Sequence, residues 1–359
     1  MRFGLRRKPR RNQDERSHWT FQARTDLEGW LSDLRRHTGP DQMDDIIQRL
    51  LIAAARMAFS DHERKLRIFD VAQSFGAHFL PVHFYSPVPD TSAIPEQTWT
   101  NRYDHLLGLD RDYSLSLLRH LEPFGPELAD IPATADGSYC WTNPAFNGGD
   151  ASLLYGLIRL ARPRRVIEIG SGWSTLIGLR GVRENGIGEY LCVEPYPNPD
   201  IQRLAREGRI TLDPRRVQEV PLATFEKLQA NDILFIDSTH VAQIGSDVSQ
   251  EILQIVPRQA PGVLIHLHDI FLPFEVSKDW VVDKKLFWNE QLLLAAFMAY
   301  NSEFKAMASN QFIARDPILC AAARRAFPHT PVIGGGSFWF SRHGRPWWEG
   351  QRSRQADIA

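Results

Sequence analysis

Two different spacings of hydrophobic residues divide the chain. In residues 44–75 (DDIIQRLLIAAARMAFSDHERKLRIFDVAQSF) the apolar side chains recur every three or four positions, which predicts helices. From residue 148 onward, short apolar runs alternate with helical patterns. This alternation predicts an α/β fold, a parallel sheet with helices on both faces, and the apolar strands fit burial on both sides.

Seven strands are predicted in the alternating part. Their ranges are 165–170 (RVIEIG), 190–195 (YLCVEP), 209–212 (RITL), 232–237 (DILFID), 262–269 (GVLIHLHD), 304–308 (FKAMA) and 336–342 (GSFWFSR). Helices are predicted over 150–160, 173–185, 199–207, 246–256 and 288–301.

The predicted organisation has four parts. Residues 1–75 form a helical N-terminal extension with a basic tail, MRFGLRRKPRR, and residues 76–145 are rich in Pro and aromatic side chains. Because Pro removes a backbone donor and stops helices, we expect 76–145 to be an extended segment able to cover a pocket. A flexible linker would not carry Phe84, Tyr85 and Trp99. Residues 146–345 hold the α/β domain, and 346–359 form a C-terminal tail.

Composition narrows the class of protein. Hydrophobic residues are 43% and charged residues 24%, as in a soluble globular enzyme, and the net charge of -1 argues against a nucleic-acid surface spread over the chain. The basic tail favours a solvated segment over a nucleic-acid or membrane contact. It lacks an apolar core, so no secretory signal is expected.

The cysteines and the apolar runs predict the setting of the protein. Cys140, Cys192 and Cys320 have neither metal spacing nor a disulfide framework, which predicts a reduced, cytoplasmic environment. No apolar run approaches the roughly 20 residues that a membrane helix needs, so no membrane partner is expected.

The stretch RVIEIGSGWST (165–175) is typical of a strand that turns into a helix over a ligand. Gly170 and Gly172 let the backbone approach that ligand, but Thr175 stands where a dinucleotide fingerprint has its third glycine. Glu168 precedes the glycines, where we expect it to repel a pyrophosphate. Glu194 follows 22 positions after Gly172 and could accept ribose hydroxyls in either case. A cationic ligand without phosphate, such as S-adenosylmethionine, suits this turn better, and the absence of GK[ST] excludes a P-loop.

The chain resembles a known family at this point. EIGSG, the acid of VEP, FID and the seventh strand look like class I S-adenosylmethionine-dependent methyltransferases. The likeness is to a methyltransferase domain 24-like subgroup, through FYSPVPD, NPAFNGGDASLLYGLIR, FIDSTH and HLHDIF. It spans roughly residues 78–342 and is dense over 140–275. The resemblance implies a Rossmann-like seven-stranded sheet whose last strand is antiparallel.

The resemblance also implies which residues hold the cofactor. Gly170, Ser171 and Gly172 would line its methionine part, and Glu194 would bind its ribose. The helix before the first strand would flank it with Asn147, Asp150 and Tyr155. The complete set of expected S-adenosylmethionine contacts is Asn147, Asp150, Glu168, Gly170, Ser171, Gly172, Ser174, Thr175, Glu194 and Asp237.

A second group of residues follows the fourth and fifth strands. Asp237 and His240 are three positions apart, and His268 and Asp269 end the fifth strand. Methyl transfer needs an oriented nucleophile and removal of its proton, which a histidine can accept. His240 is the candidate base, and His268 and Asp269 complete the candidate catalytic group. Asp237 as a cap and His240 as a structural loop residue remain alternatives.

The same group could bind a divalent metal. It is similar to metal-dependent O-methyltransferases of catechols and macrolide sugars, in which acids at the positions of Asp237 and Asp269 bind the ion. The candidate metal ligands are Asp237, His268 and Asp269. His268 departs from the pattern, because a nitrogen ligand suits Mg²⁺ poorly.

Other residues near this group have a structural interpretation. His266 is expected to be a bonded core residue. The aromatic residues after HLHD could wall an acceptor pocket, but packing of their loop is the favoured interpretation, and Trp347 and Trp348 are equally ambiguous. The aromatic residues in question are Phe271, Phe274, Trp280, Phe287 and Trp288.

The resulting hypothesis is an S-adenosylmethionine-dependent methyltransferase that acts on an oxygen of a small molecule or sugar. One alternative is a module that binds the cofactor or a related nucleoside without catalysis. A weaker alternative is an NAD(P)-dependent oxidoreductase. The acceptor and the oligomeric state do not follow from the sequence.

Overall fold

The computed structural model describes Gly29, Ser32 and residues 39–58, 62–74, 76–135, 137–146 and 148–342. The basic tail, Asn147, Trp347, Trp348 and the expected C-terminal tail lie outside the described residues, and so do the predictions made for them. The chain forms two compact units, Met1–Ser92 and Ala93–Ala359, which are described separately.

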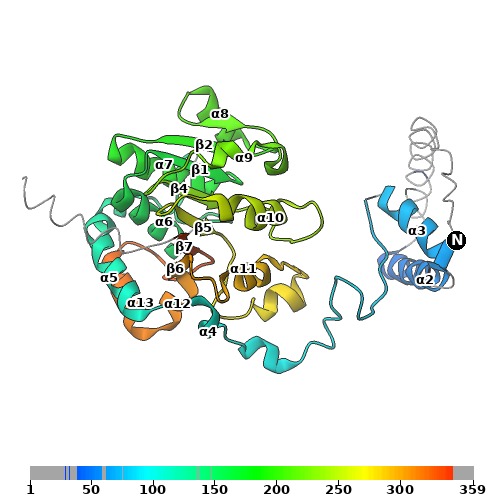
Figure 1. Cartoon of the computed structure of the whole chain (residues 1–359). Helices are drawn as coiled ribbons and strands as arrows, with labels where there is room; N and C mark the ends of the chain where they lie inside the picture. The colour runs from blue at the N-terminus through cyan, green and yellow to red at the C-terminus, as the bar shows by residue number, and fades with distance from the viewer. Residues whose placement is uncertain are drawn as a thin grey trace, which may run out of the picture. The chain divides into compact units, whose positions relative to one another are not determined.

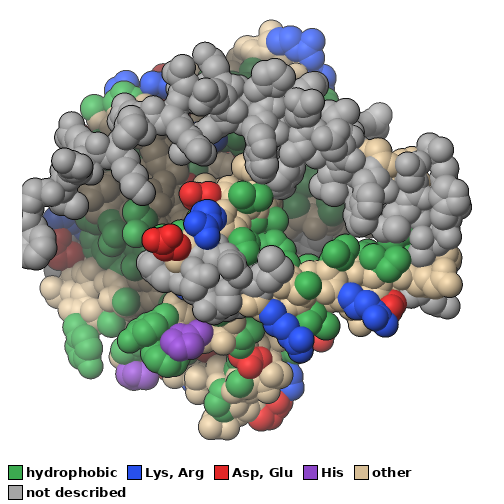
Figure 2. Space-filling view, turned by 90° about the vertical axis from the view of Figure 1, so that its right-hand side faces the viewer, with side chains coloured by type: hydrophobic (Ala, Val, Ile, Leu, Met, Phe, Trp, Pro, Cys, Tyr) green, Lys and Arg blue, Asp and Glu red, His purple; other side chains and the backbone are tan. Residues whose placement is uncertain are grey.

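The first unit contains the helices expected from its apolar spacing. They are α2 (Pro40–Ala58) and α3 (His62–Ser74), which pack against each other. Leu50, Leu51 and Ile52 on α2 are about half exposed. Phe84 and Tyr85 lie in the irregular stretch after α3, are largely exposed, and contact each other and the His83 ring. Figure 2, which views the right-hand side of Figure 1, shows hydrophobic side chains exposed among charged ones.

The second unit is built on one seven-stranded sheet with the order β3-β2-β1-β4-β5-β7-β6 (Figure 1). The strands are β1 (Arg165–Ile169), β2 (Glu189–Val193), β3 (Thr211–Asp213), β4 (Ile233–Ile236), β5 (Leu264–Leu267), β6 (Phe304–Ser309) and β7 (Phe338–Arg342). The pairs among β1 to β5 are parallel, whereas β7 is antiparallel to both β5 and β6. The expectation of an α/β fold with an antiparallel last strand is confirmed.

Alternation of side chains along the strands divides the core into two layers. On β4, Ile233 and Phe235 pack with α6 (Gly148–Ala161), α7 (Trp173–Asn185) and α8 (Pro199–Arg206). Leu234 and Ile236 pack on the other face with α9 (Leu222–Phe225), α10 (Asp247–Gln250) and α11 (Glu290–Met298). Covering helices therefore bury both faces of the sheet, as the apolar strands predict.

Helices also occur where an extended segment was expected. Residues 76–145 contain α5 (Arg111–Leu121), capped by Asp110, whose carboxylate accepts from the Tyr113 amide at 2.7 Å. Leu117, Leu118 and Leu121 of α5 are buried because the helix packs against α6 and α13. The segment continues through η2 (Glu122–Leu128), after η1 (Glu96–Thr100) and α4 (Asp104–Leu107).

The connection from β6 to β7 holds two helices that the sequence analysis did not predict. They are α12 (Asn310–Arg315) and α13 (Pro317–Ala326). The predicted helix over 246–256 is instead three short pieces, α10, the π-helix η4 (Glu251–Ile255) and η5 (Val256–Arg258). The remaining short helices are η3 (Val217–Glu219) and η6 (Asp279–Asp283).

Within the described ranges, no helix has the length and apolar character that a membrane crossing requires. The cytoplasmic setting stays a prediction.

Candidate functional site

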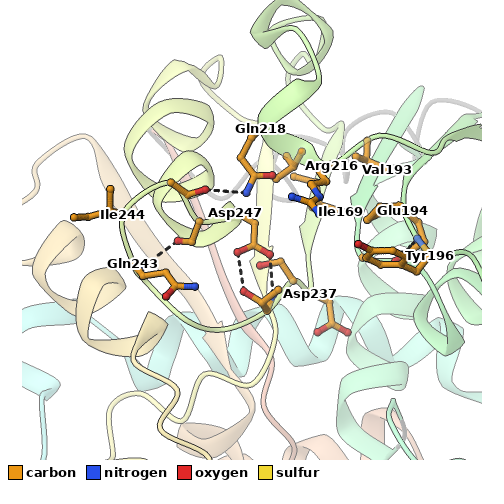
Figure 3. A pocket seen from close by; sticks show the side chains of 17 residues that line it. Ile169, Val193, Glu194, Tyr196, Arg216, Gln218, Asp237, Gln243, Ile244 and Asp247 are labelled. Carbon is orange, nitrogen blue, oxygen red and sulfur yellow. Dashed lines mark hydrogen bonds between the residues drawn. The ribbon is translucent and has the colours of Figure 1, made fainter. Parts of the chain in front are cut away.

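A cavity of about 490 Å³ opens at the carboxyl ends of β1, β2 and β4. The strand order reverses between β1 and β4, which is where open α/β sheets bind their ligands. Glu194 and Tyr196 form one side of the cavity (Figure 3). Gln243, in the loop before α10, and Asp247, the first residue of α10, lie opposite them. Residues 216–218, which follow β3, close a further side.

Gly170 makes the floor of this cavity possible. It has a φ of +79°, and a Cβ at this position would lie 1.8 Å from the carbonyl oxygen of Asp237. The two residues meet because β1 and β4 are paired in register, Ile169 with Ile236, and the Asp237 amide donates to the Ile169 carbonyl at 2.8 Å. Two positions later, a Cβ on Gly172 would meet no atom within 4 Å, so open space lies beside that residue.

Glu194 ties the two neighbouring turns together at the cavity wall. Its carboxylate accepts from the Ser171 amide at 3.1 Å and from the Tyr196 amide at 2.7 Å, one bond to each oxygen. A carboxylate oxygen has more than one acceptor site, so each keeps capacity for a hydroxyl donor. The structure therefore places Gly170 and Glu194 in the lining of one cavity, with the Ser171 amide bonded to Glu194. Contact of these residues with a cofactor stays a prediction.

Glu168 lies below the turn and not on its rim. It is fully buried and accepts from the Ser174 hydroxyl at 2.5 Å and the Thr175 hydroxyl at 2.7 Å. Burial raises the pKa of Glu168 to about 7, although both hydroxyls oppose this rise. The Glu168 carboxylate faces α7, so the expectation that it repels a pyrophosphate is weakened. The missing third glycine remains an argument against a dinucleotide. Cofactor contact by these three side chains stays a prediction.

Two residues of α6 have internal partners. The Asp150 carboxylate accepts from the side-chain amide of Asn310 at 2.7 Å and from the Ser337 amide at 2.8 Å, and so ties α6 to the loop before β7. The Tyr155 hydroxyl donates to Glu127 at 2.5 Å, within the core. These contacts of Asp150 and Tyr155 are structural. Their expected position beside the cofactor stays a prediction.

The residues after β4 and β5 form one cluster around His240. Its Nε2 lies 3.4 Å from Asp237 Oδ1 and 3.6 Å from Asp269 Oδ2, and its Nδ1 lies 3.0 Å from Glu290 Oε2. His268 joins the cluster, with Nε2 3.6 Å from Asp269 Oδ1. Asp237 also lines the cavity, so the cluster adjoins it.

The charges of this cluster are strongly coupled. Burial alone would lower the pKa of His240, but its contacts with Asp237 and Glu290 raise it to about 10. Burial would raise the pKa of Asp237, yet His268 and His240 hold it below its usual value. Burial raises the pKa of Asp269. Burial also raises the pKa of Glu290. These shifts favour a protonated His240 beside an ionised Asp237 at neutral pH.

The three candidate metal ligands do not fit an ion in this arrangement. Asp237 and Asp269 both direct an oxygen at His240 Nε2, so the imidazole takes the place that a shared cation would need. Among the described residues, His268 Nδ1 has no hydrogen-bond partner, and its Nε2 faces Asp269. Among the residues that the structure describes, no group of three or more His, Cys, Asp or Glu is placed to hold a metal.

The neighbouring aromatic residues mostly pack the loop. Trp280 contacts Phe271 and Trp288 edge-on, and Trp288 lies 4.5 Å from the His240 ring, centroid to centroid. Phe274 lies between the guanidinium groups of Arg102 and Arg315. His266 is buried, stacks on Phe235 and bonds the Ser337 hydroxyl at 2.9 Å, in agreement with a structural role.

The sequence analysis missed residues that come from distant segments. Glu290 contacts His240 across 50 positions, and Gln218 reaches the 243–247 loop by donating to the Gly245 carbonyl at 3.2 Å. For Glu290, the sequence offers one signal, an acidic residue at the start of the helix after Trp288. Acidic residues are common at helix starts, so this signal does not indicate a site.

Sheet order and cavity define a class I methyltransferase fold, and residues 167–270 match the model of a methyltransferase domain family. The matched segment is similar to that methyltransferase domain family and contains the turn after β1, all of β2, β3 and β4, and β5. An uncharacterised protein of Archaeoglobus fulgidus is 34% identical over 178 residues, which are 45% of this chain and 79% of that relative.

Solved methyltransferases share lower similarity with the chain. The O-methyltransferase TomG of Streptomyces achromogenes, in complex with S-adenosylmethionine, is 18% identical, covering 70% of this chain and 100% of that one, with a TM-score of 0.35. The O-methyltransferase of Bacillus cereus is 15% identical, covering 69% and 99%, with a TM-score of 0.32. The likeness to methyltransferases therefore rests on the domain match over residues 167–270.

Proposed function

We propose that the chain is an S-adenosylmethionine-dependent methyltransferase that acts on an oxygen of a small molecule or sugar. The observation that carries this is the cavity at the β1/β4 switch point, which has carboxylates Glu194 and Asp237 in its lining. Its volume of about 490 Å³ falls within the roughly 300–1,000 Å³ of small-molecule sites. A sulfonium nucleoside complements such a lining, because its cation meets anionic side chains.

The turn supplies space and donors for this cofactor. Gly170 lets the turn pass close to the Asp237 backbone, and Gly172 leaves open space beside the turn. Glu194 would accept the ribose hydroxyls with the lone pairs that Ser171 and Tyr196 leave free. Asp237 would face the positive sulfur side. The cofactor supplies the activated methyl group, and these residues only bind and orient it.

His240 is proposed as the base that takes the proton of the acceptor hydroxyl. It adjoins Asp237 at the cavity edge, and Nε2 is the nitrogen on that side of the ring. A pure binding module has no need of this cluster, which favours catalysis over the non-catalytic alternative. A base must begin neutral, so the raised pKa of His240 makes turnover dependent on pH.

Cofactor binding is the first test. Isothermal titration with S-adenosylhomocysteine should show one site, and a folded sample that binds neither this nucleoside nor S-adenosylmethionine would refute the proposal. Binding of NAD(P)H instead, with a change in its absorbance, would support the oxidoreductase alternative.

Turnover is the second test. With an acceptor identified by screening hydroxylated small molecules and sugars, His240→Ala should keep its cofactor affinity and lose about 10²–10⁴-fold in turnover. Full activity of that variant would remove the base assignment. The metal alternative predicts activity lost with a chelator and restored by a divalent ion, and it requires Asp237 and Asp269 to turn away from His240.

A further inference from the structure

Residues 288–290, which lead into α11, contact both the backbone and the ring of His240. We propose that Trp288, Asn289 and Glu290, here called the 288–290 clamp, position the His240 ring, with Glu290 as the residue that fixes its orientation. The inference rests on the proposed function, in which His240 is the base. None of the motifs used to recognise the family includes this segment.

The clamp first holds the backbone of His240. The amides of Asn289 and Glu290 both donate to the His240 carbonyl, at 3.1 and 3.2 Å. The Asn289 side chain accepts from the Ala242 amide at 2.6 Å and donates to the Ala242 carbonyl at 3.3 Å. His240 has a φ of +63°, a left-handed conformation that costs energy in a residue with a Cβ and persists only where neighbours enforce it.

The clamp then holds the ring from two sides. Glu290 Oε2 lies 3.0 Å from Nδ1, and the Trp288 ring packs on the imidazole with centroids 4.5 Å apart. With Nδ1 engaged by Glu290, Nε2 is left to face Asp237 and Asp269. An acid behind a histidine fixes ring orientation and protonation in the same way in hydrolase triads, where the other nitrogen does the chemistry.

Burial of Glu290 is otherwise unexplained. Its side chain is almost fully buried, and its Oε1 has no hydrogen-bond partner in the part of the chain that the structure describes. A buried carboxylate with an unsatisfied oxygen is costly, so stability alone does not account for an acid at this position. The contact of its Oε2 with His240 Nδ1 does.

The test observes the ring directly and needs no acceptor. Protein with ¹⁵N-labelled histidines is examined by NMR in the presence of S-adenosylhomocysteine, and the signal absent from His240→Gln assigns the ring. We expect a wild-type Nδ1 proton protected from solvent exchange. In Glu290→Gln its exchange should accelerate about tenfold or more, because a hydrogen bond to a charged group is worth at least that factor.

Two further variants control for indirect effects. Glu275→Gln is the matched control, because the Glu275 carboxylate accepts from the Tyr103 hydroxyl and the Val276 amide. It should leave the ring signal unchanged. Glu290→Asp keeps the charge and should restore part of the protection that Glu290→Gln loses.

Several results would overturn the clamp. They are a wild-type Nδ1 proton that exchanges freely, or a Glu290→Gln variant that folds and leaves protection unchanged. The wild-type measurement alone decides the matter if Glu290→Gln does not fold. If the wild type does not bind S-adenosylhomocysteine, the proposed function fails, but the ring signal of the free protein still tests the clamp.

Discussion

The buried carboxyl of Glu168 makes the stability of the protein depend on pH in a predictable way. In the unfolded chain this group has an ordinary pKa near 4.5, and in the folded protein burial raises its pKa to about 7. Between these two values the unfolded state releases the proton while the folded state retains it, so folding becomes less favourable as pH rises. At about 1.4 kcal/mol per pKa unit, the full effect is about 3 kcal/mol.

Glu168→Gln removes this titration with little change in shape. The amide oxygen can still accept from the Ser174 hydroxyl, which donates to Glu168 at 2.5 Å in the wild type. The free energy of unfolding of the variant minus that of the wild type should therefore rise by about 3 kcal/mol between pH 4.5 and pH 7, then level off. Subtracting the wild type cancels the titration of other groups such as His240.

Urea unfolding followed by tryptophan fluorescence, repeated across this pH range, measures the difference. Glu189→Gln is the control, because Glu189 is largely exposed and weakly paired with Arg165 at 3.4 Å, and its difference should stay flat. A difference for Glu168→Gln that is also flat, or that falls with rising pH, would refute the reasoning.

Three further predictions concern the cavity. Gly170→Ala should destabilise the protein and abolish binding of S-adenosylhomocysteine, because its Cβ would lie 1.8 Å from the Asp237 carbonyl oxygen. Gly172→Ala should keep the wild-type melting temperature and lose only affinity for S-adenosylhomocysteine. Equal effects of the two substitutions in calorimetry would contradict this. Glu194→Ala should weaken S-adenosylhomocysteine binding about 10- to 100-fold in isothermal titration, since it removes a charged hydrogen-bond acceptor, and unchanged affinity would remove the ribose assignment. If His240 is the base, kcat/KM should rise between about pH 6.5 and about pH 10. Asp237 and Glu290 raise the pKa of His240, so the neutral imidazole forms only as the pH approaches that value. A profile that is flat over this range would show that another group is the base.

Local patterns predicted much of the α/β domain. The helix over Trp173–Asn185 was predicted to its ends, because Gly172 and Gly186 bound a segment with helical spacing. The strands were recognisable because buried parallel strands are continuous apolar runs. α5 was missed since the Pro-rich stretch before it dominated the interpretation of residues 76–145, although Leu117, Leu118 and Leu121 have helical spacing.

The site was predictable where residues follow strand ends and not where orientation or packing decides. Gly170, Glu194 and Asp237 meet because parallel strands end at one edge of the sheet. Glu168 faces away from the cavity because it shares a strand face with Val166, which packs beneath the helices, and that alternation was overlooked. Glu290 reaches His240 only through the docking of α11, which no local pattern encodes.

The reversed direction of β7 brings an additional loop to the carboxyl end of β5. An antiparallel strand begins where its parallel neighbour ends, so the glycine run before Phe338 arrives beside the end of β5, where the Ile270 amide donates to the Gly336 carbonyl at 2.8 Å. This loop is not part of the strand-to-helix turns that line the cavity. A Cβ on Gly335 would lie 2.0 Å from Asp150 Oδ2, and a Cβ on Gly336 would lie 2.7 Å from Asp269 Cα. The loop therefore fixes α6 against the end of β5, and its glycines leave no room for larger side chains.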